Sequence, residues 1–158
     1  MNESPVPAHI DGKLFGLRVV VTGLLAGLAV VTGVMVFSTL KLVGPMAPDP
    51  VVADVFLGFA GLFLVANLVV VPVGLTRART AIGGVLASGD PFARYAAETF
   101  VRAGLLEGAS IFLVVGFMIT ANWLVLAPVA VFAVMLAALM PSRARFEAWA
   151  EGVRQPPS

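Results

Sequence analysis

Four long apolar segments constrain the fold of this chain more than any other feature. They cover about residues 15–40, 51–75, 99–120 and 123–140. A membrane-spanning helix needs about 20 mostly apolar residues to cross a hydrocarbon core of about 30 Å. Because lipid offers the backbone no hydrogen-bond partners, isolated spans of this kind form helices rather than strands. We therefore predict an all-α membrane protein, a four-transmembrane-helix bundle made of two antiparallel hairpins.

The composition agrees with a bilayer environment and includes few side chains that could catalyse a reaction. Of the 158 residues, 59% are hydrophobic and 12% are charged, whereas a typical soluble domain has about 25% charged residues. The formal net charge of +1 gives no indication of a nucleic-acid partner. The chain has no Cys and one His, so it lacks thiolate ligands and a His cluster for a metal or cofactor. We expect no cofactor and no enzymatic activity.

The segments that flank the spans are polar. We predict a disordered cytoplasmic N-terminus over residues 1–12, a transmembrane domain over 13–140, and a cytoplasmic amphipathic helix and tail over 141–158. The apolar stripe of that last helix consists of Phe146, Trp149, Ala150 and Val153. A helix with one apolar and one charged face lies in the plane of the membrane interface. Docking of the stripe against a partner protein is the alternative.

The distribution of positive charge predicts the orientation. Four spans place both termini on one side of the membrane. On that side lie Lys13, Arg18, Arg77, Arg79, Arg94, Arg102, Arg143, Arg145 and Arg154, and near the other side lies Lys41. Because cytoplasmic loops carry an excess of Lys and Arg, we predict a multi-pass protein of a bacterial-type cytoplasmic (inner) membrane with both termini in the cytoplasm. The predicted interfacial anchors are Arg102, Trp123, Phe146 and Trp149.

Two Asp-Pro pairs mark helix starts, because Asp caps a helix and Pro suits its first position. Asp49-Pro50 opens the second apolar segment. Asp90-Pro91 opens the third, which then becomes one helix from residue 91 to 120 whose first two turns project from the membrane. On that projecting part, Glu98 and Arg102 are four residues apart and can pair on one face. The two-residue turn after residue 120 requires an antiparallel hairpin with the fourth span.

Small residues in the spans predict close helix packing. Gly23 and Gly27 form a Gly-x-x-x-Gly motif in the first span, and Gly104 and Gly108 lie in the third. Glycine at such spacing lets the backbones of two helices approach closely. We therefore expect these four glycines at helix–helix contacts, with the first pair packed inside the bundle.

Glu107 is the acidic residue that long apolar sequence encloses on both sides. A carboxyl group inside the membrane is costly unless it faces the bundle interior, is paired or is protonated. Arg102 is five residues away, about 140° around the helix, so the two do not pair directly. Asn67 in the second span reaches the same depth if the spans are aligned by their midpoints, whereas an alignment by the cytoplasmic arginines brings Pro72 and Gly23 there instead. The preferred prediction is that Asn67 donates a hydrogen bond to Glu107.

The stretches Gly89-Asp-Pro-Phe and Leu106-Glu107-Gly108-Ala109-Ser110-Ile111-Phe112 resemble locally the loop and second helix of the rotor-ring c subunit of rotary ATP synthases. The resemblance implies that Glu107 is an ion-binding carboxylate. The chain departs from that family because it lacks the iterated Gly-x-Gly-x-Gly of the first helix. Its Glu also lies on the third of four spans, so no family is assigned.

These features favour a small integral membrane protein that acts as a non-enzymatic accessory or structural component of a membrane complex. Its expected partners are the lipid bilayer and either further copies of itself or a larger assembly. The alternative is a proton- or ion-translocating module that uses Glu107, with Asn67 beside it. An intramembrane enzyme is a third hypothesis, but Ser110 has no His or Lys nearby in the sequence.

Overall fold

The computed structural model describes residues 9–43, 50–74 and 90–154. In chain order the elements are α1 (His9–Ser38), η1 (Thr39–Val43), α2 (Pro50–Val65), η2 (Ala66–Val70), α4 (Pro91–Thr120), η3 (Trp123–Leu126), α5 (Ala127–Ala138) and α6 (Arg143–Arg154). The described residues are helical apart from caps and short turns, so the predicted all-α class is confirmed for them. α1 begins at His9, four residues before the start of the predicted transmembrane domain.

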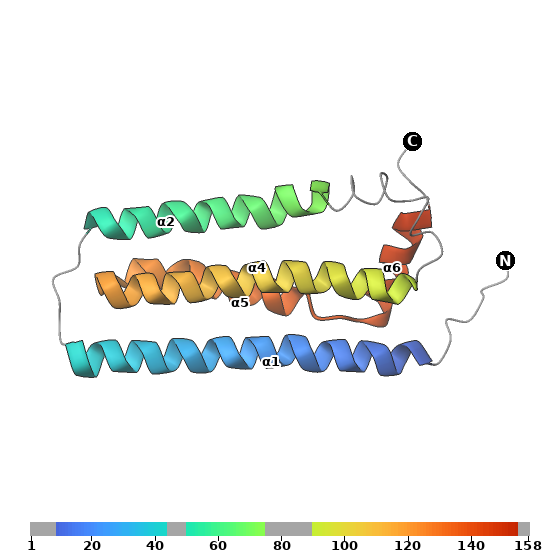
Figure 1. The fold of residues 1–158 in the computed structure, drawn as a ribbon, viewed down its shortest axis with the longest axis horizontal. Helices are drawn as coiled ribbons and strands as arrows, with labels where there is room; N and C mark the ends of the chain where they lie inside the picture. Colours follow the sequence, from blue (N-terminus) through green and yellow to red (C-terminus); the bar gives the residue numbers. More distant parts are fainter. Residues whose placement is uncertain (1–8, 44–49, 75–89, 155–158) are drawn as a thin grey trace.

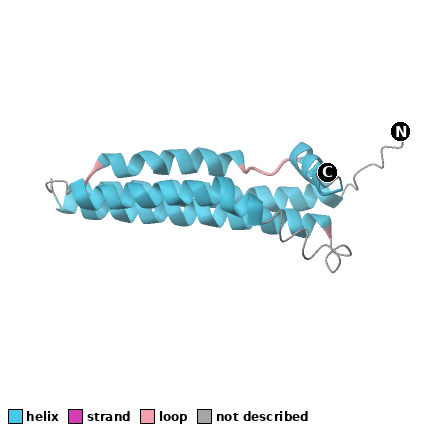
Figure 2. Cartoon of the chain, turned by 90° about the horizontal axis from the view of Figure 1, so that it is seen from above, coloured by secondary structure: helices cyan, strands magenta, loops and turns pink. Residues whose placement is uncertain are grey.

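The helices α1, α4 and α2 lie side by side, and α4 is between the other two (Figure 1). After a turn of 90°, α5 is seen in a second layer behind this row (Figure 2). α4 packs against α1, α2 and α5, whereas α1 and α2 lie on opposite sides of α4. Half of the most apolar window of α4 is buried within the chain, compared with 11% for α1 and for α2. α4 is therefore the central helix, with neighbours on three of its sides.

Local capping explains where α4 begins and ends. The Asp90 side chain accepts a hydrogen bond from the Phe92 backbone N–H at 2.9 Å, and Pro91 occupies the first helical position, as predicted. At the other end Ala121 adopts a left-handed conformation with φ 50°. Asn122 then caps η3 through a hydrogen bond from the Leu124 N–H. The short turn produces the expected antiparallel hairpin between α4 and α5 (Figure 1).

One turn of α2 is widened where a proline follows it. η2 is a π-helical segment, and Pro72 lies just beyond it. Proline lacks an N–H and its ring clashes with the carbonyl four residues earlier, so a locally widened turn relieves the conflict. Asn67 is the buried residue of this segment, and the widened turn therefore forms the local backbone that carries it.

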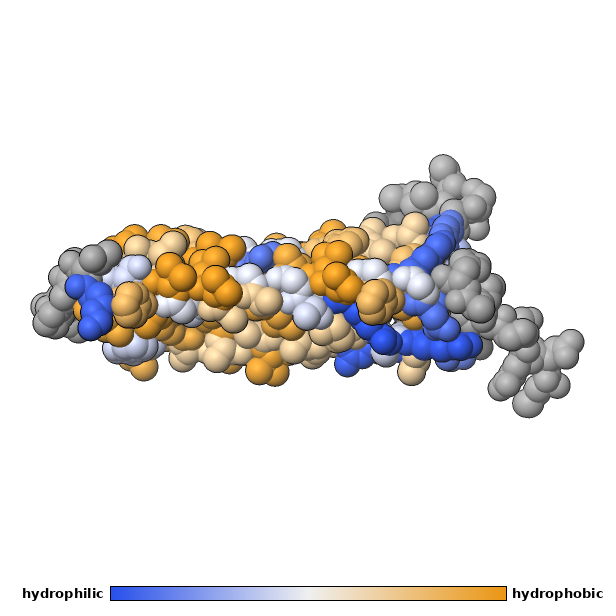
Figure 3. Space-filling view, turned by 90° about the horizontal axis from the view of Figure 1, so that it is seen from below, coloured by the Kyte–Doolittle hydropathy of each residue, from blue (hydrophilic) through white to orange (hydrophobic). Residues whose placement is uncertain are grey.

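Three helices are long and apolar enough to cross a membrane: Ile10–Lys41, Pro50–Gly74 and Pro91–Thr120. A fourth candidate, Trp123–Ala138, is followed after a bend of 82° by Arg143–Gly152. Orange apolar residues cover the middle of the face in Figure 3, and blue hydrophilic residues gather at the end where α6 lies. This distribution of apolar and polar surface is compatible with a multi-pass membrane protein.

Several sequence-based predictions concern residues outside the described ranges. They include the first eight residues of the predicted disordered N-terminus, the cap at Asp49, and the loop with Arg77 and Arg79. The tail after residue 154 also lies outside them.

Candidate functional site

No described helix covers the fourth side of α4. The outward residues along this side are Ala97, Phe100, Val101, Gly104, Gly108, Ile111, Val115 and Ile119. They recur every three or four residues, so they form one continuous stripe on a helix. We call this stripe the open face of α4. α1 and α2 flank it on either side (Figure 1).

Glu107 lies at the edge of the open face and is half-buried. Within the part of the chain that the structure describes, its carboxyl group has no hydrogen bond and no ion pair. The buried residues Ala103 and Val114 lie close to it around the helix, on the side that faces α1. Its carboxyl group thus stands between the packed core and the uncovered surface.

The predicted hydrogen bond from Asn67 to Glu107 is wrong. Asn67 is buried, and its side-chain N–H₂ group donates to the backbone carbonyl of Arg102 at 3.3 Å. Arg102 precedes Glu107 by five residues, which is about 7.5 Å along the helix axis. α2 is therefore displaced toward the start of α4 compared with an alignment of the two spans by their midpoints. Asn67 ties α2 to the α4 backbone and leaves Glu107 to other partners.

None of the four predicted packing glycines packs closely against another described helix. A Cβ atom built at Gly23, Gly27, Gly104 or Gly108 would have no neighbouring atom within 4 Å. The expectation that the Gly-x-x-x-Gly of α1 packs within the bundle is therefore wrong for this chain by itself. These residues face outward because the core side of α1 is taken by the larger apolar residues of the adjacent positions, including Leu28.

The glycine that does pack is Gly116, which the sequence analysis missed. A Cβ atom at this position would lie 2.5 Å from the Phe56 ring of α2. Next to it, Phe112 contacts the rings of Phe56, Phe59 and Phe63 with centroid separations of 4.9, 5.5 and 6.2 Å. The spacing of three aromatic residues along α2 was the available sequence signal. α2 is thus held to α4 by an aromatic cluster opposite a glycine.

A polar network joins the starts of α1 and α4 to α6. Lys13 forms an ion pair with Asp90 at 2.7 Å, and Arg18 donates to the Pro141 carbonyl at 2.7 Å. Arg143 lies 3.8 Å from Asp11. Arg143 also donates to Glu147 at 2.9 Å, and this carboxylate raises the pKa of the guanidinium. These contacts fix the position of α6 across the end of the bundle.

The apolar stripe of α6 packs on the chain itself. Phe146 is buried together with Leu14, Leu17 and Tyr95, and Trp149 packs against this cluster. The two predicted lipid anchors of α6 are therefore internal contacts, because Pro141 and the 82° bend fold α6 back over the bundle end. Trp123 lies at the far end, is 57% exposed and contacts the ring of Phe117.

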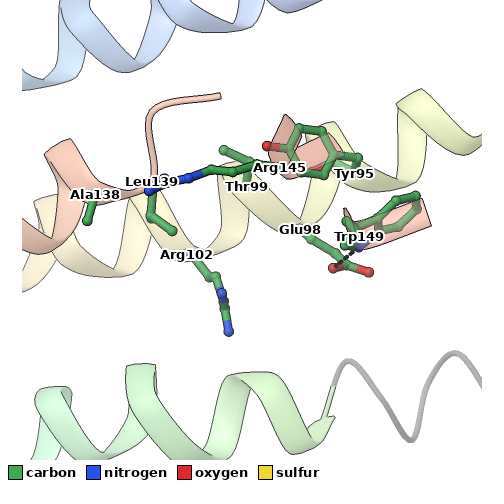
Figure 4. A pocket seen from close by; sticks show the side chains of 8 residues that line it. All are labelled: Tyr95, Glu98, Thr99, Arg102, Ala138, Leu139, Arg145 and Trp149. Carbon is green, nitrogen blue, oxygen red and sulfur yellow. Dashed lines mark hydrogen bonds between the residues drawn. The ribbon is translucent and has the colours of Figure 1, made fainter. Parts of the chain in front are cut away.

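A cavity of about 240 Å³ lies between α4, the end of α5 and α6. Its lining residues are Tyr95, Glu98, Thr99, Arg102, Ala138, Leu139, Arg145 and Trp149 (Figure 4). The expected pair between Glu98 and Arg102 does not form. The Trp149 indole N–H donates to Glu98 at 2.9 Å, and Figure 4 shows Arg102 pointing away from this contact, toward α2.

The remaining polar groups in the span of α4 are satisfied locally. Ser110 is fully buried and its hydroxyl donates to the Leu106 carbonyl at 2.7 Å. In the described ranges no three His, Cys, Asp or Glu residues gather in a way that could hold a metal ion. No protein-family model, no curated protein and no solved structure matches the chain.

Proposed function

We propose that the chain is a four-helix transmembrane bundle with both termini in the cytoplasm of a bacterial-type cell. We further propose that it acts as a non-enzymatic accessory or structural component of a membrane complex. In this arrangement the open face of α4 receives a transmembrane helix of a partner. The observation that carries the proposal is the outward position of all four glycines at which close helix packing is expected.

The glycines of α1 and α4 belong to one surface. Lys13 and Asp90 pair at the starts of these two parallel helices. Gly27 lies fourteen residues after Lys13, and Gly104 lies fourteen residues after Asp90. The two glycines are therefore at about the same depth. Gly27 is nine residues beyond Arg18, half a turn around the helix. Arg18 reaches toward the end of α5, so Gly27 lies on the side of α1 away from α5.

Glu107 determines which side chains of a partner helix this surface would favour. It lies one helical turn beyond Gly104, within the apolar part of α4. A carboxyl group at membrane depth is stabilised by a hydrogen-bond donor or a cation, and small residues allow a second helix to come close enough to supply one. A partner helix with Lys, Arg, Asn or Gln at this depth would meet both requirements.

Site-specific cross-linking tests the proposal, because the chain has no cysteine of its own. A benzophenone-maleimide probe is attached to Ile111→Cys on the open face or to Val134→Cys on α5, which is 69% exposed. We expect a discrete adduct in native membranes from the first variant and none from the second. An adduct of twice the 16.4 kDa chain mass would identify a second copy as the partner. Equal labelling at both positions would refute the proposal.

Proton or ion translocation through Glu107 is the second candidate function, favoured by the lack of a partner for its carboxyl group among the described residues. Proton flux into proteoliposomes, compared between the unmodified chain and Glu107→Gln, separates the two functions. The accessory function predicts no flux from either protein. Flux that the substitution abolishes would support translocation instead.

A further inference from the structure

The cavity beside Arg102 contains a buried hydrogen-bond donor that lacks a partner, which is rare in folded proteins. The Nε atom of Arg102 is buried and has no hydrogen-bond partner, and no described residue forms an ion pair with its guanidinium. Arg145 lines the same cavity and donates only a long hydrogen bond of 3.4 Å, to the Met140 carbonyl. A buried donor nitrogen without a partner is costly, and an anion bound in the cavity would supply its acceptor.

The charge of the cavity agrees with an anionic occupant. Arg102 and Arg145 contribute two positive charges and Glu98 one negative charge, which leaves a net positive lining. Glu98 already accepts the indole N–H of Trp149, and Figure 4 shows this contact on the far side of the cavity from Ala138 and Leu139. Arginine suits phosphate because its planar donors can bind two oxygens at once.

A second, apolar groove lies farther along α5, in the half of that helix next to η3. α2 packs on α4 and on η3 but makes almost no contact with α5. A hollow of about 410 Å³ therefore lies between α2 and α5. Its lining residues are Leu57, Ala60, Gly61, Leu64, Leu124, Ala127, Pro128, Val131 and Phe132. These side chains are apolar, so the groove suits hydrocarbon.

One phospholipid is long enough to reach from the cavity into the groove. Leu139 lines the charged cavity, and the α5 residues that line the groove lie between Ala127 and Phe132. They precede Leu139 by seven to twelve positions, about 10 to 18 Å along a helix. One leaflet is about 15 Å deep, half of a hydrocarbon core of about 30 Å, so the groove lies at the depth of the acyl chains. We infer that the chain binds an anionic phospholipid, with its phosphate at Arg102 and Arg145 and one acyl chain in the groove between α2 and α5.

This inference does not depend on the proposed partner helix, because the open face of α4 lies on a different side from α5. The test is native mass spectrometry of the full chain in detergent, titrated with phosphatidylglycerol or phosphatidylcholine of identical acyl chains. We expect phosphatidylglycerol to bind at least about tenfold more tightly, since it lacks the choline cation that the positive cavity repels. Equal affinity for the two lipids would overturn the inference.

Two substitutions probe the two halves of the site. Arg102→Gln should weaken phosphatidylglycerol binding about tenfold, as expected for the loss of one charge-assisted contact. The hydrogen bond from Asn67 uses the backbone carbonyl of Arg102 and survives this change. Gly61→Leu should weaken binding similarly by filling the groove, and a Cβ atom built at this position has no neighbouring atom within 4 Å.

Two matched control variants test whether these effects are specific to the proposed site. Lys41→Gln removes an exposed cation from η1, at the opposite end of α1 from the cavity, and Gly58→Leu adds the same side chain as Gly61→Leu at an outward position of α2. Both should bind phosphatidylglycerol like the unmodified chain. Inorganic phosphate should compete poorly; full competition at the concentration of the lipid would show an anion site without an acyl site. A dimer that Gly61→Leu dissociates would show that a helix, not a lipid, occupies the groove. Either result would overturn the inference.

Discussion

Two sides of α4 have similar small and apolar residues but opposite surroundings. On the side of α2, Gly116 and Phe112 lie against a cluster of phenylalanine rings. On the open face, Gly104 and Gly108 meet no neighbouring atoms at all. A glycine in a membrane span therefore does not by itself indicate a helix–helix contact. Its contribution to stability depends on which side of the helix another element covers.

The largest effect is expected from adding a side chain at Gly116, on the side of α4 that α2 covers. Gly116→Leu should destabilise the isolated chain by roughly 3 kcal/mol, because the new side chain collides with the Phe56 ring, 2.5 Å from the position of its Cβ. The measurement is unfolding by sodium dodecyl sulfate followed by far-ultraviolet circular dichroism. Gly108→Leu, in open space, should change stability by less than about 0.5 kcal/mol. Equal destabilisation by both changes would contradict the assignment of the two sides.

The second-largest effect is expected from removing the aromatic side chain of Phe112. Phe112→Ala should cost about 1–2 kcal/mol, because three aromatic contacts are lost and lipid fills part of the space. The neighbouring Ile111 is 40% exposed on the open face, and its replacement by Ala should cost less than about 0.5 kcal/mol. Thermal unfolding of the two variants in the same detergent compares them directly. A larger loss for the Ile111 variant would reverse the comparison.

The third effect concerns the polar contact between α2 and α4. Asn67→Ala removes the hydrogen bond to the Arg102 carbonyl and should cost about 0.6 kcal/mol, the average for such bonds between membrane helices. Chemical unfolding of this variant and of Asn67→Asp shows whether an N–H donor is required. If Asn67→Ala proves as stable as the unmodified chain, the contact does not hold α2 in place.

The smallest effect on the isolated chain is expected at Glu107. Glu107→Gln should leave its unfolding free energy within about 0.5 kcal/mol, because no described residue bonds to the carboxyl group. The same change should reduce the cross-linked adduct formed from Ile111→Cys, since the neutral amide is a weaker acceptor for a donor on the partner helix than a carboxylate. Blue native electrophoresis and cross-linking yield measure the second effect. A variant that is destabilised alone yet still assembles would show that Glu107 serves the fold rather than the interface.

A large part of the fold could be predicted from the sequence because it follows from local physics. Apolar length and the lack of backbone partners in lipid dictate helices, and Asp90-Pro91 dictates where α4 starts. The proposed site could not be predicted equally well. The midpoint alignment placed Asn67 beside Glu107, whereas the aromatic cluster and Gly116 set a different register between α2 and α4.

The sequence by itself determined that this chain is helical, that its spans are apolar, and that Glu107 is the carboxyl group they enclose. The tertiary structure decided which surfaces remain uncovered. Helix propensity and hydropathy act over neighbouring residues, whereas the open face of α4 and the groove along α5 arise from how helices distant in sequence are placed around one another. The same placement folds α6 over the bundle end and leaves the Nε atom of Arg102 buried without a hydrogen-bond partner among the described residues.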